Sequence, residues 1–359
     1  MRIVFDVTPL SHQRTGVGNY IRGSLAGLVE AAGEDDQIVA FAPTSAAGAR
    51  LAGEALDGIP VERRVRTLPL AHAWRTVWSR LGWPPVERFA GRLDVFHFAD
   101  WMYPPQRAGV RATMVHDLVP LRFPEWVHPR TRWMHGRKYR NAARTCHVIF
   151  ANSEFTANDV VELLGVPRER IRVAHPGVDH GFSPGGDRAD VGRPYVFTVA
   201  TLEPRKNLDT LATAYRLLNG DRALAVAGAA GWGAQPALDV DGIVRLGYVP
   251  NGDLPRWYRG ADVSVYPSRF EGFGMPVVES MACGTPCVAS AHPSLDEACG
   301  DAAVRVDPEN PEAIAAGIEE ALARRDELVP RGLEHARRFT WRTVGETMLA
   351  GYREAREGL

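Results

Sequence analysis

The chain has 359 residues, of which 42 are lysine or arginine and 43 are aspartate or glutamate, so its formal net charge is −1. This length exceeds the usual size of one hydrophobic core and predicts two domains, and the balanced charge gives no global reason to expect nucleic-acid binding. A content of 45% apolar and 24% charged residues, with 26 prolines and 35 glycines, excludes a fibrous or disordered chain.

Short apolar runs alternate with helical or turn-rich segments through the first half of the chain. The first run, residues 3–7, is followed by a glycine-containing loop and a helical pattern from about 19 to 30. Further strand-like runs lie at 38–42, 61–65, 95–98, 112–115 and 148–151. This alternation predicts a parallel sheet with helices on both faces.

The same pattern restarts after a break. Residues 175–194 are dense in turn formers and predict a linker, after which strand-like runs lie at 195–200, 223–227, 243–246, 263–266 and 286–290. We therefore expect a first domain at 1–180, a second at 190–339, and a helix at 340–359 that packs back on the first. Ligands of open parallel sheets bind beyond the carboxyl ends of the strands, so we expect the function in a central cleft that both domains face.

The four cysteines, Cys146, Cys283, Cys287 and Cys299, have no spacing typical of a zinc or disulfide module and are expected to be reduced and structural. The first residues lack the apolar segment and cleavage site of a signal peptide. No run reaches the roughly 18 apolar residues of a membrane span. We therefore expect a cytoplasmic protein, whose membrane contacts would be peripheral.

The densest functional signal is the sequence EGFGMPVVE, which begins at Glu271 and ends at Glu279, just after the run 263–266. Gly272 and Gly274 let the backbone approach a ligand, and Pro276 suits the first turn of a helix whose free N–H groups attract phosphate. Glu279 is expected to project from the same helix end, where a carboxylate suits a ribose diol. Alternatively, both acids only complement the helix dipole.

The two glutamates separated by seven residues, within EGFGMPVVESMACGTPCVAS, resemble the signature of the retaining glycosyltransferases of the GT-B fold, family 4. Other landmarks in the family's order are TGVGNYIRGSL near the start, the pair His116-Asp117, the run ATLEPRKN at 200–207 and the ending FTW at 339–341. The opening and the PRKN run look closest to the branch that handles mannose and related sugars in surface polysaccharides.

The resemblance implies an α/β fold of two Rossmann-like, doubly wound parallel-sheet domains. It also implies transfer of a hexose, with GDP-mannose the preferred donor, to an acceptor hydroxyl in polysaccharide or glycoconjugate biosynthesis. Guanine and uracil stay open as the base, which backbone groups near Val249 would read. A nucleotide-sugar epimerase of the same architecture and a non-catalytic sugar-nucleotide-binding subunit remain as alternatives.

The cation pair Arg205 and Lys206 follows the run 195–200, where a donor diphosphate would arrive and its leaving charge would need neutralising. A surface basic pair is the alternative. Many relatives carry an arginine at the position of Thr201, so Arg205 is expected to supply that charge. His116, at the end of the run 112–115, is expected to contact the donor sugar; the alternative is a structural histidine.

The loop with Gly16 and Gly18 does not fit the dinucleotide fingerprint, which makes an NAD-linked enzyme a poor interpretation. The resemblance implies instead that this loop closes over the donor, although a plain flexible turn stays open. The expected catalytic residues are His116, Glu271, Arg205 and Lys206. The expected donor-binding residues are Gly16, Gly18, Thr201, Val249, Gly272, Phe273, Gly274, Met275, Pro276 and Glu279. No metal ligand or cofactor is expected, because the cations and a helix dipole can stabilise the leaving group.

Basic and aromatic residues gather from Arg122 to Arg144, in a segment expected to form a loop and a helix. They could bind an acidic or lipid-linked acceptor at the inner membrane face, or form a solvated helix with extended arginines, and both readings stay open. The expected partners are a nucleotide-sugar donor and a saccharide or lipid-linked acceptor, without nucleic acid.

Overall fold

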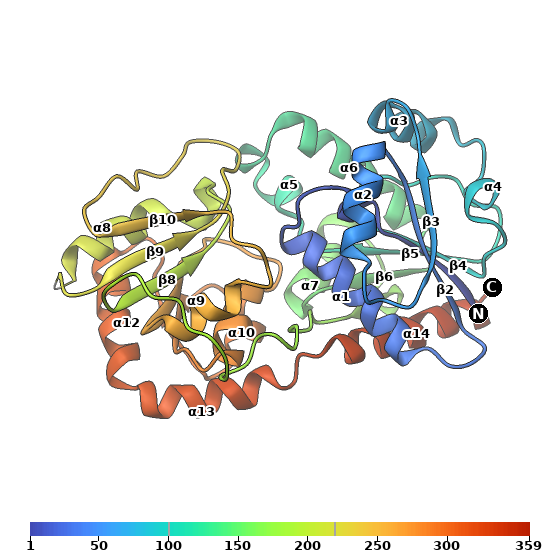
Figure 1. The fold of residues 1–359 in the computed structure, drawn as a ribbon. Helices are drawn as coiled ribbons and strands as arrows, with labels where there is room; N and C mark the ends of the chain where they lie inside the picture. The colour runs from blue at the N-terminus through green and yellow to red at the C-terminus, as the bar shows by residue number, and fades with distance from the viewer. Residues whose placement is uncertain (100, 219) are drawn as a thin grey trace. The chain divides into compact units, whose positions relative to one another are not determined.

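The structure, a computed structural model, describes residues 1–99, 101–218 and 220–359. It divides into two compact units (Figure 1). The first unit contains Met1–Leu121, Pro129–Gly177 and Thr340–Leu359, and the second contains Arg122–His128 and Val178–Phe339.

The first unit contains a seven-stranded parallel sheet in the order β3-β2-β1-β4-β5-β6-β7. Its strands are β1 (Arg2–Asp6), β2 (Gln37–Thr44), β3 (Glu62–Thr67), β4 (Val95–Phe98), β5 (Val110–Val115), β6 (Val148–Ala151) and β7 (Ile171–Val173). Its helices are α1 (Gly16–Ala31), α2 (Ala46–Ala55), α3 (Ala71–Leu81), α4 (Glu87–Ala90), α5 (Val119–Arg122), α6 (Pro129–Thr145), α7 (Glu154–Leu164) and α14 (Trp341–Glu357), with 3-10 turns at Thr8–Ser11 and Arg168–Arg170.

The second unit contains a six-stranded parallel sheet in the order β10-β9-β8-β11-β12-β13. Its strands are β8 (Tyr195–Val199), β9 (Ala223–Ala227), β10 (Ile243–Gly247), β11 (Val263–Tyr266), β12 (Cys287–Ser290) and β13 (Ala303–Val306). Its helices are α8 (Leu208–Leu217), α9 (Leu254–Gly260), α10 (Met275–Ala282), α11 (Asp296–Cys299), α12 (Pro311–Ala323) and α13 (Arg325–Ala336), with 3-10 turns at Pro124–Trp126, Pro204–Lys206 and Pro293–Leu295.

Both faces of each sheet are buried under apolar side chains. In β1, Ile3 and Phe5 join the cluster under α1 and α14, whereas Val4 joins the cluster on the other face with Trp78. Successive residues of a strand point to opposite faces, so a strand covered on both sides must be apolar throughout. This explains why the central strands appear in the sequence as continuous apolar runs.

The last helix, α14, lies beside α1 in the first unit (Figure 1). The two helices approach closely because glycines face each other's backbone. A Cβ atom at Gly27 would lie 1.8 Å from the carbonyl oxygen of Trp341, and one at Gly345 would lie 2.0 Å from the carbonyl oxygen of Gly27. Val344 and Met348 of α14 enter the same hydrophobic cluster as the core face of α1.

Two strands and one loop segment differ from the sequence-based expectation. The short outer strands β7 and β13 were not predicted, since each interrupts its apolar residues with an arginine. Residues 122–128 were expected within the first domain but belong to the second unit. The reason is packing: the ring of Phe123 lies 5.1 Å from that of Phe270, and His128 contacts Trp232 edge-on.

Candidate functional site

The second sheet has a topological switch point between β8 and β11. From β8 the chain proceeds outward through β9 and β10, and it then returns to β11 and proceeds through β12 to β13 on the other side. Loops that leave two such neighbouring strands diverge, which opens a crevice at their carboxyl ends where ligands of this sheet type bind. The turn Pro204–Lys206 follows β8 and the loop of Glu271 follows β11, so both predicted motifs lie at this point.

The carboxylate of Glu271 is the centre of the site. Its Oε1 accepts hydrogen bonds from Lys206 Nζ at 2.6 Å, Tyr266 OH at 2.9 Å and Ser268 Oγ at 2.5 Å, and its Oε2 accepts one from Arg205 Nη1 at 2.9 Å. The residue is only 7% exposed. Burial would raise the pKa of this carboxyl, but the charges of Arg205 and Lys206 outweigh that effect and lower it to about 2. Glu271 is therefore an anion throughout the physiological pH range.

The two cations are held by more than one partner each. Arg205 donates from Nη1 to the carbonyl of Phe270 at 2.8 Å and from Nη2 to Glu203 at 2.9 Å. Lys206 also donates to Tyr266 OH at 2.8 Å. Burial and the neighbouring arginine lower the pKa of the Lys206 ammonium, and Glu271 acts in the opposite direction. The site thus brings together three of the four predicted catalytic residues in a rigid, nearly charge-balanced cluster.

Asn207 fixes this cluster to the loop after β11. It has a left-handed backbone with φ of 60°, which asparagine tolerates better than most residues. Its Nδ2 donates to the carbonyl of Pro267 at 3.1 Å and of Pro308 at 2.6 Å. The backbone N–H of Arg269 donates to the carbonyl of Arg205 at 2.9 Å. The turn after β8 and the loop after β11 therefore form one structural block.

Sequence reasoning missed three residues that surround Glu271. Tyr266 and Ser268 bond its carboxylate, and Ser294 Oγ accepts its backbone N–H at 3.0 Å. His292 Nδ1 in turn lies 2.9 Å from Ser294 Oγ. A serine three residues before the glutamate and a tyrosine at the end of β11 were the signals available, but neither residue type indicates a site by itself.

The start of α10 has the geometry predicted for close backbone approach. Gly274 precedes the helix with φ of 103°, and a Cβ atom there would lie 2.4 Å from Leu295 Cδ2, so only glycine fits. Met275 and Pro276 are half-buried and form the first turn, and Gly272 is buried in the loop before it. The helix begins at Met275, so the proline is its second residue.

Phe273 lies in the hydrophobic core rather than beside the cluster. It is 3% exposed, and its ring lies 5.3 Å from that of Phe339. Any contact of this residue with a ligand would therefore be made by its backbone.

Glu279 occupies a different environment from Glu271. It lies in the second turn of α10, 5% exposed, where Tyr258 OH donates to its Oε2 at 3.3 Å. Burial and the negative charge of Asp179 raise its pKa to about 8, and the bond from Tyr258 offsets only part of this. At neutral pH this carboxyl is therefore mostly protonated, unlike the free carboxylate expected from the sequence.

Two further residues that were predicted to bind the donor belong to the second unit. Thr201 is half-buried and follows β8. Its side chain lies against Gly231, where an added Cβ atom would be only 2.8 Å from Thr201 Cγ2. Val249 is half-buried after β10 and packs on the cluster that contains Phe197 and Tyr258. Neither side chain touches the cluster of Glu271 in any described contact.

In the first unit, Gly16 and Gly18 belong to the first turn of α1 rather than to a loop. The helix begins three residues earlier than expected, with extended Thr15 as its N-cap and a bond from Asn19 N to the Thr15 carbonyl at 2.9 Å. Glycine breaks the periodicity that marks a helix, but the first-turn N–H groups need no intrahelical partner. Gly16 is exposed and has open space where a Cβ would be.

His116 lies just after β5, with its ring 4.9 Å from the ring of Tyr20 in α1. Its Nε2 is buried and has no hydrogen-bond partner among the described residues. Burial and the positive charge of Lys138 lower its pKa to about 3, so the ring is neutral at physiological pH. Lys138, 3% exposed, donates to the carbonyls of Met114 at 2.8 Å and Ala99 at 3.3 Å. The sequence did not single out this lysine.

The basic and aromatic segment 122–144 divides between the two units. Its first part belongs to the second unit, and α6, in the first unit, carries Arg130, Trp133, Arg137, Arg140 and Arg144. Across the described ranges of the chain, no helix is both long enough and apolar enough to cross a membrane.

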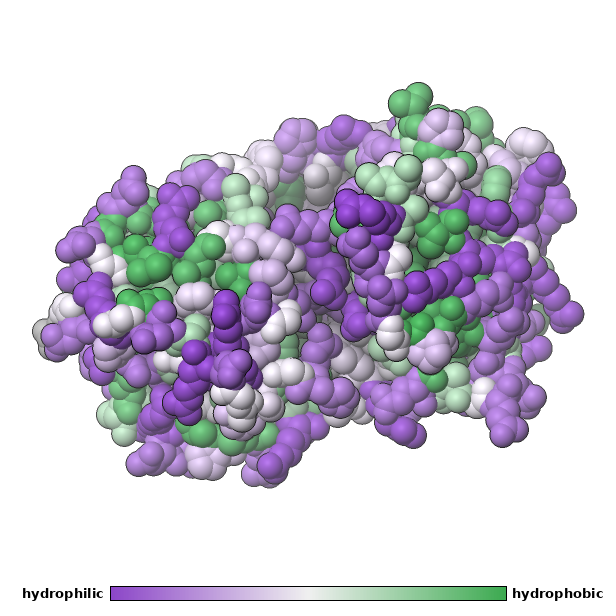
Figure 2. All heavy atoms as spheres, in the orientation of Figure 1, coloured by the Kyte–Doolittle hydropathy of each residue, from purple (hydrophilic) through white to green (hydrophobic). Residues whose placement is uncertain are grey.

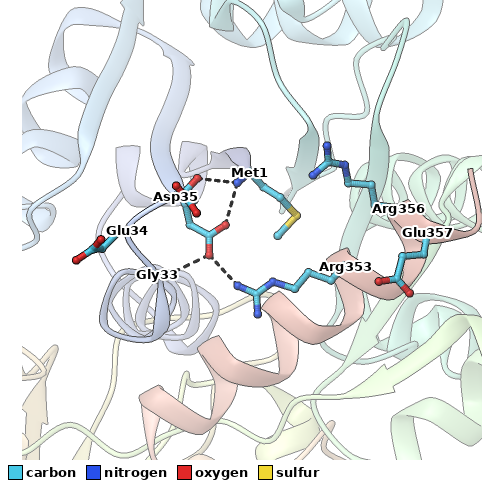
Figure 3. A pocket seen from close by; sticks show the side chains of 8 residues that line it. Met1, Gly33, Glu34, Asp35, Arg353, Arg356 and Glu357 are labelled. Atoms are coloured by element: carbon cyan, nitrogen blue, oxygen red, sulfur yellow. Dashed lines mark hydrogen bonds and ion pairs between the residues drawn. The ribbon is translucent and has the colours of Figure 1, made fainter.

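A separate cavity of about 540 Å³ lies in the first unit among Met1, Gly33, Glu34, Asp35, Asp36, Arg353, Arg356 and Glu357 (Figure 3). Asp36 bridges the amino group of Met1 and the guanidinium of Arg353, each at 2.9 Å. Met1 directly precedes β1, so the cavity lies at the amino edge of the sheet, where ligands of such sheets do not usually bind.

An Asp-x-Asp triplet occurs at 239–241, with both carboxylates exposed. Within residues 1–99, 101–218 and 220–359, no three histidine, cysteine, aspartate or glutamate side chains gather as metal ligands do.

Comparison with protein families covers both halves of the chain. Residues 14–182 match the family described as Glycosyltransferase Family 4, and residues 185–339 match the family described as Glycosyl transferases group 1. O-antigen chain mannosyltransferase B of Escherichia coli is 28% identical over 98% of this chain and 100% of its own length. D-inositol 3-phosphate glycosyltransferase of Mycolicibacterium smegmatis is 36% identical, but over 58% of this chain and 52% of its own length, so the match spans about half of that relative.

Solved structures resemble the whole chain. Sucrose-phosphate synthase from Thermosynechococcus elongatus superposes over 100% of both chains with a TM-score of 0.73 at 18% identity. The Anabaena protein HepE, solved in complex with UDP-glucose, superposes over 100% of both chains with a TM-score of 0.71 at 17% identity.

Proposed function

We propose a specific reaction for this chain, which belongs to the glycosyltransferases that combine a family 4 domain with a group 1 domain. The reaction is transfer of mannose from GDP-mannose to a hydroxyl of a saccharide or lipid-linked acceptor, with retained anomeric configuration. The observation that carries the donor site is the cluster of Arg205, Lys206 and Glu271 at the switch point of the second sheet.

The cluster supports a role for Arg205 and Lys206 in diphosphate stabilisation. Bonds to Glu271 hold both cations in place before a ligand arrives, and fixed charges stabilise a developing anion without having to reorganise. The free N–H groups at the start of α10, which follows Gly274, add a positive dipole. We propose that the leaving diphosphate lies against these groups, with Glu271 orienting hydroxyls of the sugar.

Glu279 fits a ribose contact in its protonated form. A neutral carboxyl both donates and accepts hydrogen bonds, whereas a carboxylate only accepts. A ribose diol can pair with either form, and its hydroxyl donors would favour the anion. We therefore propose that nucleotide binding lowers the pKa of Glu279 from its value of about 8.

His116 is proposed to contact the donor sugar. The buried Nε2 atom and the low pKa support a neutral ring that offers a hydrogen bond rather than a charge. Its backbone carbonyl would steady positive charge at the anomeric carbon. Departure of the diphosphate and attack by the acceptor hydroxyl then occur on the same face of the sugar, and a phosphate oxygen takes the acceptor proton.

The donor and acceptor are proposed from similarity. The relative that matches this chain end to end is an O-antigen chain mannosyltransferase, which supports mannose and a polysaccharide or glycolipid acceptor. The solved relative with UDP-glucose keeps a uridine donor as the competing hypothesis. We propose that no metal is required and that the protein acts in the cytoplasm, at the inner membrane face when its acceptor is lipid-linked.

A thermal-shift panel of GDP, UDP, ADP, TDP and their sugar conjugates, with and without magnesium, tests the donor. A ligand that binds only the folded state raises the melting temperature by mass action. GDP and GDP-mannose should stabilise the protein without metal, and Lys206→Ala should reduce the shift. Arg331→Ala, which removes an exposed arginine from α13, is the matched control. Stabilisation by UDP alone would show that the donor carries uracil and not guanine. Stabilisation that depends on magnesium would overturn the proposal that no metal is required.

Product analysis separates transfer from its alternatives. A transferase releases GDP only with acceptor and leaves the free donor sugar unchanged, as nuclear magnetic resonance of the anomeric proton would record. Conversion of the free sugar without acceptor would indicate an epimerase. Binding without GDP release under any acceptor tried would support a non-catalytic subunit.

A further inference from the structure

An apolar stripe on α3 and its flanks is exposed to solvent. Leu70, which precedes the helix, is 84% exposed, Leu81 at its end is 70% exposed, and Val77 between them is half exposed. Spacings of seven and four residues place the three on one side of the helix. Trp83, two residues beyond the helix, is 64% exposed. In the space-filling view, hydrophobic residues gather over α3 (Figure 2).

The stripe is not the face by which α3 packs. That face is formed by Ala71, Arg75 and Trp78, which are buried, with Trp78 in the cluster on one face of the sheet. The helix is therefore anchored to its own unit, and its second apolar face is left in water. Exposed apolar side chains gathered in one place, unlike scattered single ones, indicate an interaction surface.

Helix α6 adds an aromatic and basic border. Trp133 is exposed, with the guanidinium of Arg80 4.5 Å from its ring centroid and that of Arg137 at 5.4 Å. These residues and Tyr103 line a shallow hollow between α3 and α6. We call the set of Leu70, Val77, Leu81, Trp83 and Trp133 the α3 surface.

The segments that form this surface lack acidic residues. Residues 67–86 contain Arg80 and the buried Arg75, and residues 129–145 of α6 contain five arginines and the buried Lys138, and neither stretch contains an aspartate or glutamate. The whole chain, by contrast, is nearly neutral. Positive charge is thus concentrated where apolar side chains are exposed.

We propose that the α3 surface docks on an anionic lipid bilayer. Leucine and valine enter the acyl boundary, tryptophans occupy the interfacial layer that they prefer, and arginines contact the lipid phosphates. A helix of this kind lies in the plane of the interface and does not span it. A second copy of the chain fits poorly, because pairing this surface with itself would oppose like charges.

The inference rests on the proposed function for its purpose, since docking would bring the protein to a lipid-linked acceptor. Its test needs neither donor nor acceptor, so the two can fail separately. It also extends the peripheral contact predicted for 122–144, because α3 supplies the apolar part.

Vesicle flotation tests the proposal. Wild-type protein should float with vesicles of phosphatidylglycerol and phosphatidylcholine, but not with phosphatidylcholine alone, and 0.5 M salt should weaken binding about tenfold. The triple variant Leu70→Ser/Leu81→Ser/Trp83→Ser should lose at least about tenfold in partition. Val161→Ser/Leu217→Ser/Leu359→Ser, which removes exposed apolar residues elsewhere, should bind as wild type.

Depth of insertion gives a second readout. The native cysteines are buried, so a fluorophore can be placed selectively at Leu81→Cys, with Leu217→Cys as control. Nitroxide-labelled lipids should quench the first label and spare the second. No flotation with anionic vesicles, or equal binding by the triple variant, would overturn the proposal. A wild-type dimer in sedimentation that the triple variant abolishes, without flotation, would assign the surface to a second copy.

Discussion

Glu271 and Glu279 lie in one sequence motif and are equally buried, yet their ionisation differs. The pKa of Glu271 is about 2 because Arg205 and Lys206 contact its two oxygens, and that of Glu279 is about 8 because its neighbours are Tyr258 and the anionic Asp179. Burial acts in the same direction on both. The neighbouring charges therefore decide which glutamate carries a proton, and with it which chemistry each can perform.

The difference suits two tasks in one ligand. A permanent anion that fixes two cations belongs beside a diphosphate, where charge changes during the reaction. A carboxyl that has no cation beside it costs less to bury when it is protonated than when it is charged, and the hydroxyl donors of the proposed ribose contact would draw it toward the anion.

Replacing Glu271 by glutamine should destabilise the protein by about 3–5 kcal/mol, because it leaves Lys206 buried without an anion and leaves Arg205 with only the more exposed Glu203. Glu203→Gln, which removes the other carboxylate of Arg205 at a more exposed position, is the matched control and should cost about 1 kcal/mol. Urea unfolding at pH 7 measures both. A loss below about 1 kcal/mol for Glu271→Gln would show that the cluster is not held by charge.

The pH dependence of stability should reveal Glu279. A carboxyl whose pKa rises from 4.5 to about 8 on folding binds more protons in the folded state, so it lowers the free energy of unfolding as pH increases between those values. Full linkage corresponds to about 5 kcal/mol, and relaxation around the site should leave at least about 2 kcal/mol. The difference between wild type and Glu279→Gln, measured by urea unfolding from pH 5 to 8.5, isolates this contribution.

Glu271 should show the opposite trend. Its pKa is below the ordinary value, so its contribution is complete above pH 4.5 and is lost as pH falls toward 2.

For Glu279, the contradicting outcome is a Glu279→Gln variant whose stability relative to wild type does not change from pH 5 to 8.5. That result would contradict the protonated state assigned to Glu279.

Lys206→Ala should weaken binding of nucleoside diphosphate and of its sugar conjugate together, by about tenfold, since a charge-assisted bond of about 1.4 kcal/mol is lost. Lys206→Arg should restore part of the affinity. Calorimetric titration measures both ligands, and circular dichroism checks the fold of each variant. Unchanged affinity for both ligands would remove Lys206 from the phosphate site.

His116→Ala should slow transfer about tenfold while leaving nucleoside diphosphate affinity within about twofold, because the proposed contact is with the sugar. The lost rate should appear in kcat, measured by GDP release with acceptor present. Full residual activity would show that His116 has only a structural role, in packing against Tyr20.

Lys138→Met should have the smallest effect. Removing this positive charge allows the pKa of His116 to rise from about 3, so the acid limb of the pH–rate profile should move upward, whereas Lys138→Arg should leave the limb in place. An unchanged profile in Lys138→Met would show that burial alone keeps His116 neutral.

Much of the fold could be predicted from the sequence, and the reason is visible in the strands. Five-residue runs such as β9 are buried on both faces, so their apolar character is continuous. The predicted GT-B fold of two parallel-sheet domains is confirmed by the sheets and by the family matches. The strands β7 and β13 and the early start of α1 could not be found, since arginines and glycines interrupt the patterns there.

The site was only partly predictable. Position after a strand, together with the family resemblance, singled out Arg205, Lys206 and Glu271, and the structure brings them together because carboxyl ends of neighbouring parallel strands meet at one edge. The protonation of Glu279 could not be predicted, since Tyr258 and Asp179 come from distant parts of the chain. For the same reason, nothing in the sequence linked Ser294 to Glu271. The roles of all the predicted catalytic and donor-binding residues stay predictions.

Hydrogen–deuterium exchange with and without GDP-mannose is the most direct test of the donor site. We expect protection of the backbone in 201–208 and 268–280, with weaker effects of GDP alone on segments that contact the sugar. Protection confined to the cavity of Asp36 and Arg353, or no protection at saturating donor, would contradict a donor site at the switch point of the second sheet.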